Sequence, residues 1–158
     1  FAIAANKRKR KRWVNKKKKN KHNNTYLFVA AAGNDNKVID ASYKPLACGI
    51  QEPNLLCVAS SDSSNQKSWF SNYGVGYVHV FAPGSSIYST VPNNGYGYKS
   101  GTSMACPQVS GLAALIRTME NGLNGQQVKY SISVHLVIYL YRDTKQLDGT
   151  ISKVIKMS

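Results

Sequence analysis

Short apolar runs separated by turn residues occupy the middle of the chain. Residues 26–32 form an apolar run without polar alternation, and a Gly-Asn-Asp turn stops it. Such a run is typical of a strand buried on both faces of a parallel sheet. Residues 55–59 and 78–82 predict two more short strands that end in turn residues, and residues 86–91 predict another.

The apolar period becomes helical after residue 103. One helical face is predicted by positions three and four apart, which are Val109, Leu112, Ala113 and Ile116. The residues between them are also small or apolar, which predicts a helix buried nearly all round. An Asn-Gly pair ends it. Residues 126–133 predict a second helix, and the apolar stretch 134–141 is short enough to be a buried strand.

Apolar strands that alternate with helices indicate an α/β protein with a layered sheet. The 158 residues contain no internal repeat and are enough for one core. We divide the chain into residues 1–25, the end of a helix followed by a basic low-complexity insertion, and residues 26–158, one incomplete domain. No apolar run reaches the ~20 residues that a membrane span needs.

One segment carries most of the positive charge. The net charge is +14, but 11 of the 21 basic residues lie between Lys7 and Lys21 with no acid among them. The rest of the chain has ten basic and seven acidic residues, a net charge of +3. Like charges at this density repel, so we predict a solvated insertion. A nucleic-acid or nuclear-localisation patch is the weaker interpretation, because no groove-reading pattern accompanies the charge. A site of proteolytic cleavage is a third.

The three cysteines, Cys48, Cys57 and Cys106, have no metal-ligand spacing. Cys48 and Cys57 could pair, but two buried free thiols are at least as compatible with the sequence. No acidic cluster marks a calcium site. We therefore expect neither a metal nor a cofactor within this chain.

Ser103 lies at the predicted start of the long helix. A serine hydroxyl is a weak nucleophile until a base takes its proton. Unpaired amides at a helix N-terminus favour negative charge that develops on nearby oxygens, and Gly101 lets a substrate backbone approach closely. The G-x-S-x-G nucleophile elbow is absent, since residue 105 is Ala, which argues against an α/β-hydrolase. On these features alone, a serine that caps an ordinary buried helix is the better interpretation.

Residues 100–107 read S-G-T-S-M-A-C-P and closely resemble the serine signature of subtilisin-like proteases, S-G-T-S-M-A-x-P. The resemblance implies that Ser103 is the nucleophile of a subtilase. It also implies a three-layer subtilisin-like α/β fold with a mainly parallel sheet. Residues 26–158 would then be the C-terminal part of the catalytic domain, about half of that fold.

Other segments resemble the subtilase family in the family's own order. Residues 28–34 look like the strand and turn that present the oxyanion-hole asparagine, so the resemblance assigns that role to Asn34. An amide N–H aimed at a tetrahedral oxyanion suits the chemistry. The backbone residues that would form one wall of the primary specificity pocket are Ala31, Ala32 and Gly33. Further matching segments, such as F-S-N-Y-G at 70–74 and A-P-G at 82–84, are expected to be structural.

The triad partners of a subtilase do not occur in this sequence. The family's aspartate and histidine blocks, D-[ST]-G and H-G-T-H, should precede the oxyanion asparagine, and neither is present. None of the three histidines, His22, His79 and His135, has the neighbours of a general base. His79 is expected to be a strand residue with a local hydrogen bond. Gln108 stands where the family commonly has a non-catalytic histidine.

Three functions remain open. The first is a serine endopeptidase that cleaves polypeptides through an acyl-enzyme on Ser103, with Asn34 in the oxyanion hole and the triad Asp and His supplied upstream. The second is a pseudoprotease or truncated product that only binds. The third, favoured only by residues 7–21, is a nucleic-acid-binding protein. We favour the first and expect no nucleic-acid partner. The family implies a secreted or secretory-pathway location and, in the full-length protein, calcium and a pro-segment.

Overall fold

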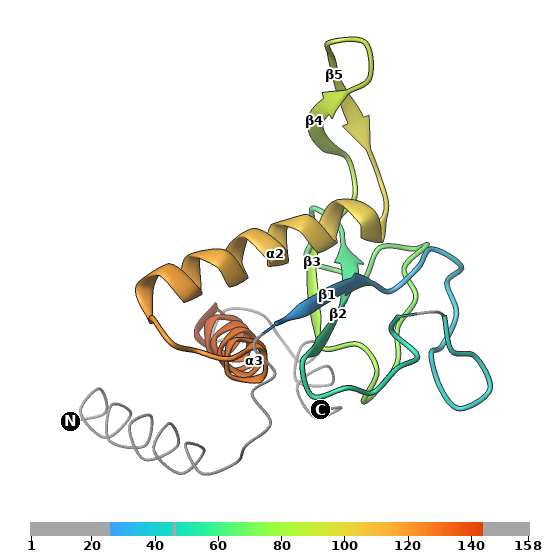
Figure 1. Cartoon of the computed structure of the whole chain (residues 1–158). Helices are drawn as coiled ribbons and strands as arrows, with labels where there is room; N and C mark the ends of the chain where they lie inside the picture. The colour runs from blue at the N-terminus through green and yellow to red at the C-terminus, as the bar shows by residue number, and fades with distance from the viewer. Residues whose placement is uncertain (1–25, 46, 144–158) are drawn as a thin grey trace.

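The structure is a computed structural model that describes residues 26–45 and 47–143. Three short parallel strands form a sheet in the order β1-β2-β3, and two further strands form a separate antiparallel hairpin, β4-β5. The hairpin projects from the body and leads into helix α2, which crosses over the sheet before the chain turns into α3 (Figure 1). The elements are β1 (Phe28–Ala31), β2 (Leu55–Ser61), β3 (Val80–Pro83), β4 (Ile87–Val91), β5 (Gly95–Lys99), α2 (Thr102–Met119) and α3 (Gly125–Asp143).

Strand β2 is central and separates two apolar clusters. Successive side chains of a strand point to opposite faces, so Leu56 and Val58 face the helices while Cys57 and Ala59 face the loops. The helix-side cluster is completed by Val80, Ala82, Ala105, Val109, Ala113, Val128 and Ile132. The loop-side cluster is completed by Ala32, Ile39 and Cys48. The fold class predicted from the sequence is confirmed as α/β, with a parallel sheet packed against helices.

The predicted strands are present with shifted ends. The run 26–32 narrows to β1, while β2 extends two residues beyond the predicted end at residue 59. Strand β3 begins at Val80 because the preceding His79 uses its ring to bond the backbone of β2. Strand β4 pairs with β5 and not with the sheet.

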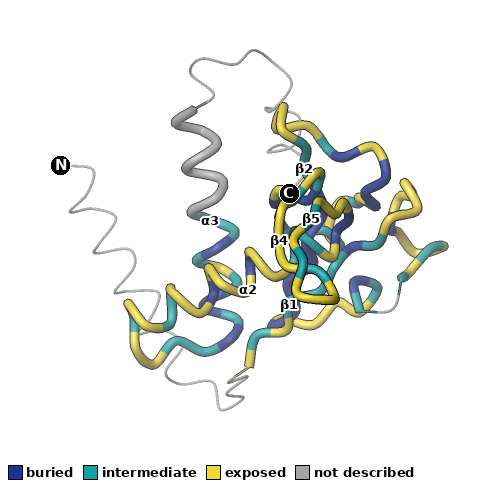
Figure 2. The backbone as a smooth tube through the Cα atoms, turned by 90° about the horizontal axis from the view of Figure 1, so that it is seen from above, coloured by how far each residue is buried: buried dark blue, intermediate teal, exposed yellow. Residues whose placement is uncertain are grey.

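The hairpin partner β5 was not predicted. Its signal was present: residues 92–95 read P-N-N-G, and asparagines before a glycine are typical of hairpin turns. Asn93 and Asn94 adopt positive φ values of 65° and 55°, which asparagine tolerates better than most residues. Both strands of the hairpin are largely exposed, as Figure 2 shows.

Helix α2 has the predicted position but not the predicted burial. Only one stripe of the helix is buried, and it consists of Thr102, Ala105, Val109 and Ala113. Leu112, Leu115 and Met119 are exposed, so the expectation of burial nearly all round was wrong. The physical reason is that, among the described residues, the sheet and α3 contact only one side of this helix.

Helix α3 continues through the stretch that we expected to form a strand. The sequence contains no Gly or Pro between Gln126 and Asp143, so nothing interrupts the helix that begins at Gly125. The strand predicted at 134–141 was therefore wrong, because a short apolar run alone does not distinguish a buried strand from a helix. The helical tail predicted at residues 1–6 lies outside the described residues.

Cys48 and Cys57 form a disulfide that ties the loop before β2 to the strand itself. Of the two open alternatives, the structure therefore shows the pair and not the free thiols. Cys106 is a free cysteine on α2. No helix in the described ranges is long and apolar enough to cross a membrane.

Candidate active site

Asn34 and Thr102 join the turn after β1 to the start of α2. The backbone N–H and the hydroxyl of Thr102 both donate to Oδ1 of Asn34, each at 2.9 Å. The Thr102 hydroxyl in turn accepts the backbone N–H of Gly33 at 3.1 Å. A backbone N–H can only donate, so the Asn34 atom that faces Thr102 must be the oxygen. These bonds therefore fix the carboxamide with Oδ1 toward Thr102 and Nδ2 on its other side.

Two hydrogen-bond donors flank the same space beside Gly101. A Cβ placed on Gly101 would lie 3.3 Å from Nδ2 of Asn34 and 3.7 Å from the backbone nitrogen of Ser103. Within residues 26–45 and 47–143, neither donor has an acceptor. Unpaired N–H groups at a helix N-terminus bind anions. The pair can therefore stabilise an oxyanion that forms next to Ser103.

Ser103 is the second residue of α2, and its side chain is exposed. The helix start is held by the backbone, since the N–H of Gly101 donates to the carbonyl of Gly84 at 2.7 Å. Pro107 has no N–H to return to the carbonyl of Ser103. Thus the structure brings Ser103 and Asn34, two residues predicted from separate motifs, to one end of the sheet.

The segment predicted to line the specificity pocket leads from β1 to Asn34. Ala32 is fully buried, and its N–H extends the sheet by donating to the carbonyl of Val58 at 2.9 Å. Gly33 has a φ of +98°, and a Cβ there would lie 2.5 Å from the side-chain nitrogen of Asn72. Only glycine fits at this position. For Ala31, Ala32 and Gly33, contact with substrate stays a prediction.

An anionic carboxylate follows Asn34 directly. Hydrogen bonds from the Tyr43 hydroxyl at 2.8 Å and from Asn72 Nδ2 at 3.3 Å, with the nearby positive charge of Lys37, lower the pKa of Asp35. The same Asp35 contact raises the pKa of Tyr43. In the sequence, Asp35 is simply the last residue of the Gly-Asn-Asp turn. Its hydrogen bonds to Tyr43 and Asn72 appear only in the structure.

His79 forms the local hydrogen bond expected from the sequence. Its Nδ1 accepts the backbone N–H of Cys57 at 2.9 Å. Burial, aided by the positive charge of Lys129, lowers the pKa of His79 to about 4. The ring is therefore neutral near pH 7, and its Nδ1 is already hydrogen-bonded to strand β2. Of the other histidines, His22 lies outside the described residues and the side chain of His135 is not among those described.

Gln108 makes a specific contact that the sequence did not reveal. Its Nε2 donates to the carbonyl of Pro83 at 2.7 Å and to the carbonyl of Met104 at 3.0 Å. The side chain thereby fastens the end of β3 to the first turns of α2. An amide at this position holds the serine-bearing helix against the sheet without any group that titrates.

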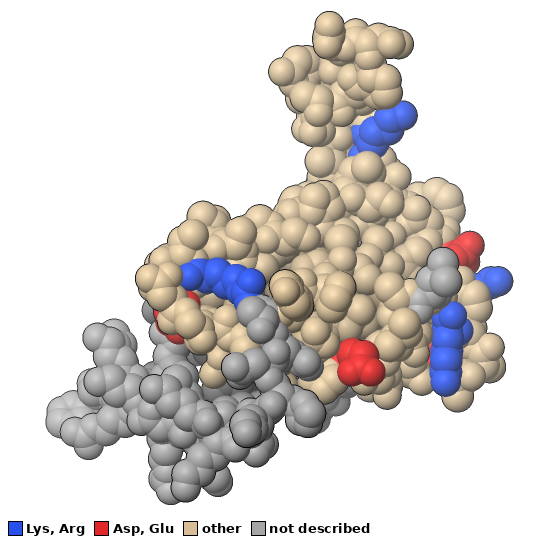
Figure 3. Space-filling model, viewed as in Figure 1, with Lys and Arg blue, Asp and Glu red and all other residues tan. Residues whose placement is uncertain are grey.

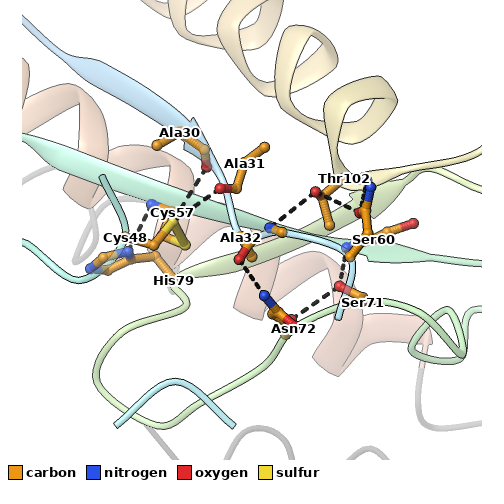
Figure 4. The surroundings of a disulfide bond; sticks show 12 residues. Ala30, Ala31, Ala32, Cys48, Cys57, Ser60, Ser71, Asn72, His79 and Thr102 are labelled. Carbon is orange, nitrogen blue, oxygen red and sulfur yellow. Dashed lines mark hydrogen bonds between the residues drawn. A yellow bond between two sulfur atoms is a disulfide. The ribbon is translucent and has the colours of Figure 1, made fainter. Parts of the chain in front are cut away.

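The disulfide lies behind the predicted pocket wall (Figure 4). Sγ of Cys48 is 3.4 Å from the carbonyl oxygen of Ala31 and 3.8 Å from that of Ala30. A disulfide sulfur carries no proton, so these are packing contacts. The cross-link therefore supports β1 close to the point where the chain turns toward Asn34.

Charge on the described surface is dispersed. Figure 3 shows lysine and arginine side chains at several places on the face in view, with acidic side chains near some of them. No group of three or more His, Cys, Asp or Glu residues gathers in the part of the chain that the structure describes. The basic segment 7–21 lies outside that part.

Known proteins are similar to this chain in sequence and in structure. The family model described as the Subtilase family matches residues 4–144. Subtilisin-like protease 2 of Plasmodium falciparum (isolate 3D7) is 45% identical over 91 residues, which cover 57% of this chain and 7% of that protein. The extracellular basic protease of Dichelobacter nodosus is 35% identical over 134 residues, or 80% of this chain and 21% of that protein.

A solved structure supports the same relationship. The crystal structure of a cold adapted subtilisin-like serine proteinase aligns with a TM-score of 0.57 and 44% identity, over 65% of this chain and 36% of that chain. The chain thus spans only a minor share of the length of these relatives. Because the family model matches most of its residues, the chain belongs to the Subtilase family.

Proposed function

We propose that this chain is the nucleophile-bearing part of a serine endopeptidase. Ser103 attacks the scissile carbonyl of a polypeptide, and Nδ2 of Asn34 with the N–H of Ser103 binds the oxyanion of the tetrahedral intermediate. The observation that carries the proposal is the convergence of these two unpaired donors beside Gly101. Residues 31–33 would contact the substrate residue before the scissile bond.

The general base and its orienting carboxylate are, in this proposal, supplied by residues outside the chain. No described histidine bonds Ser103, and His79 is held by the backbone of β2. A triad without its base retains only residual catalysis. The relatives are several times longer than this chain, which leaves room for the missing partners.

We place the protein in the secretory pathway or outside the cell. The Cys48–Cys57 disulfide fits an oxidising compartment, and one relative is an extracellular protease.

A fluorophosphonate probe tests the nucleophile in the full-length protein that contains this chain. The expected result is covalent labelling of Ser103, found by peptide mapping, and its loss in S103A. Asn34→Ala should keep the labelled site but lower kcat by about 10²–10³-fold. If Ser103 is not labelled and the full-length protein cleaves no peptide, the alternative of a binding-only pseudoprotease holds. If S103A cleaves a peptide as the wild type does, Ser103 is not the nucleophile and the proposal fails.

A further inference from the structure

A buried asparagine from a distant loop holds the turn that carries Asn34. Asn72 is fully buried. Its Oδ1 accepts the backbone N–H groups of Asp35 at 3.0 Å and Lys37 at 2.9 Å. Its Nδ2 donates to the carbonyl of Ala32 at 2.9 Å and to Oδ2 of Asp35 at 3.3 Å. All the hydrogen-bonding capacity of this amide is therefore used.

The four hydrogen bonds of the Asn72 side chain given above all go to the segment 32–37. The backbone N–H of Asn72 adds a bond to the carbonyl of Gly33 at 3.0 Å. Asn72 thus bonds residues on both sides of Asn34 but makes no hydrogen bond with Asn34 itself. Figure 4 shows its side chain directed at the Ala32 carbonyl, at the end of β1.

The turn is exposed to solvent and depends on these bonds for its shape. Asn34, Asp35 and Lys37 are all exposed, so packing does little to order their backbone. Thr102 fixes the Asn34 carboxamide from the helix side, and that contact positions Nδ2 only if the backbone of Asn34 is also fixed. Asn72 supplies that second constraint, and the close approach of Gly33 to its side chain leaves the turn little freedom.

We propose that Asn72 is a positioning residue of the oxyanion hole, acting on Asn34 through the backbone of residues 32–37. This inference rests on the function proposed above. A displacement of about 1 Å in a catalytic group can lower turnover by about 10²-fold. Losing the clamp should therefore reduce kcat even though Asn34 remains.

The test compares, in the full-length protein, two buried asparagines that bond the chain at opposite ends of β1. Asn72→Ala should lower kcat for a peptide substrate by about 10–100-fold. Asn54→Ala is the matched control, because buried Asn54 bonds the carbonyl of Tyr26 at the other end of β1, at 3.1 Å. It should leave kcat at the wild-type value. Equal loss in both variants would reduce Asn72 to a general structural role and overturn the proposal.

A double-mutant cycle with Asn34→Ala separates positioning from stability. If Asn72 acts through Asn34, N72A causes no further loss of kcat once the Asn34 donor is gone. The same fold-loss in both backgrounds overturns the proposal. Asn72→Asp covers the case in which N72A fails to fold. It keeps the volume and the acceptor but loses both donors and sets a carboxylate beside Asp35, so wild-type kcat in N72D also overturns it.

Hydrogen exchange keeps this proposal distinguishable from the proposed function. N72A should speed amide exchange at Asp35 and Lys37, and N54A should not. Unchanged exchange in N72A overturns the positioning of the turn, whatever the activity. If the wild-type protein neither cleaves a peptide nor is labelled at Ser103, the proposed function fails, and so does the predicted effect of Asn72 on kcat. Hydrogen exchange still decides whether Asn72 holds the turn.

Discussion

At the scale of single residues, the site depends on hydrogen bonds whose donors and acceptors are unambiguous. Thr102 makes three hydrogen bonds: it donates twice to Asn34 and accepts once from Gly33. Only the hydroxyl can do two of these three tasks. Its contribution can therefore be separated from the backbone contact, which every residue at this position would keep.

Thr102→Val should lower kcat of the full-length protein by about tenfold with little change in KM. Valine has the same shape but leaves the N–H of Gly33 without its acceptor and frees one side of the Asn34 carboxamide; a lost hydrogen bond of this kind is worth about 1 kcal/mol. Steady-state kinetics on a peptide substrate measure the effect. Thr102→Ser, which keeps the hydroxyl, is the control, and equal kcat for the two variants would contradict the prediction.

His79 should make stability depend on pH. Burial and the nearby Lys129 lower its folded-state pKa from 6.5 to about 4, so between these values the unfolded chain binds more protons than the folded one. Stability from this group is full above pH 6.5 and is lost as pH falls toward 4. The loss should be on the order of 2 kcal/mol, allowing for partial solvent access.

Thermal unfolding across this pH window measures the His79 effect. His79→Asn is the control, because an amide oxygen can replace Nδ1 as the acceptor for Cys57 but does not titrate. The difference in unfolding free energy between the wild type and H79N should change between pH 6.5 and 4. A constant difference would show that His79 is not the titrating group.

At the scale of elements, the disulfide joins a loop to β2 and supports β1 from behind. Removing it in C48A/C57A should lower the free energy of unfolding by about 2–3 kcal/mol, because the cross-link restricts the unfolded chain. Denaturant unfolding of the full-length protein measures the change. Cys106→Ala is the matched control, since Cys106 is unpaired. Equal stability of the double variant and C106A would contradict a structural disulfide.

Local patterns were sufficient to predict most elements and the position of Ser103 at the start of a helix. The strands around Val58 and Val80 and the helix after Ser103 follow from runs and periods that lie within a few residues of each other. The predicted second helix ended too early, at residue 133, because a continuous apolar run shows neither the helical period of 3.6 residues nor the strand period of 2. Strand β5 was not predicted, although the P-N-N-G turn between β4 and β5 is typical of a hairpin.

Contacts between distant segments could not be predicted from the sequence. Asn72 appears there as one letter of a structural motif, yet its side chain bonds Ala32, Asp35 and Lys37 from far along the chain. The same holds for Gln108 and Pro83. Such partners depend on how β1, β2 and α2 meet in space. The pairing of Cys48 with Cys57 also needed the geometry, since two buried thiols suited the sequence equally well.

At the scale of the whole molecule, the proposed function assigns to the described residues one half of a catalytic arrangement. The helix-side core holds α2 on the sheet, and the loop-side core with the disulfide holds the turn after β1. Both cores thus end at the meeting point of Asn34 and Ser103. The strongly basic segment, residues 7–21, is separate in sequence from the residues of both cores.

Removing residues 7–21 should therefore separate charge from catalysis. The deletion lowers the net charge of the chain from +14 to +3. For the full-length protein, we expect unchanged kcat/KM on a peptide substrate and an unchanged unfolding temperature.

Binding to a single-stranded oligonucleotide, measured by fluorescence anisotropy, should be weak in the intact protein and should vanish in the deletion variant. The weak binding should fall steeply with salt, because lysine and arginine contacts to phosphate release counterions. Replacing residues 7–21 by a Gly/Ser linker of equal length controls for spacing. If the linker variant loses peptidase activity, the segment is part of the enzyme and not an insertion; if it still binds the oligonucleotide, the nucleic-acid contact lies outside residues 7–21.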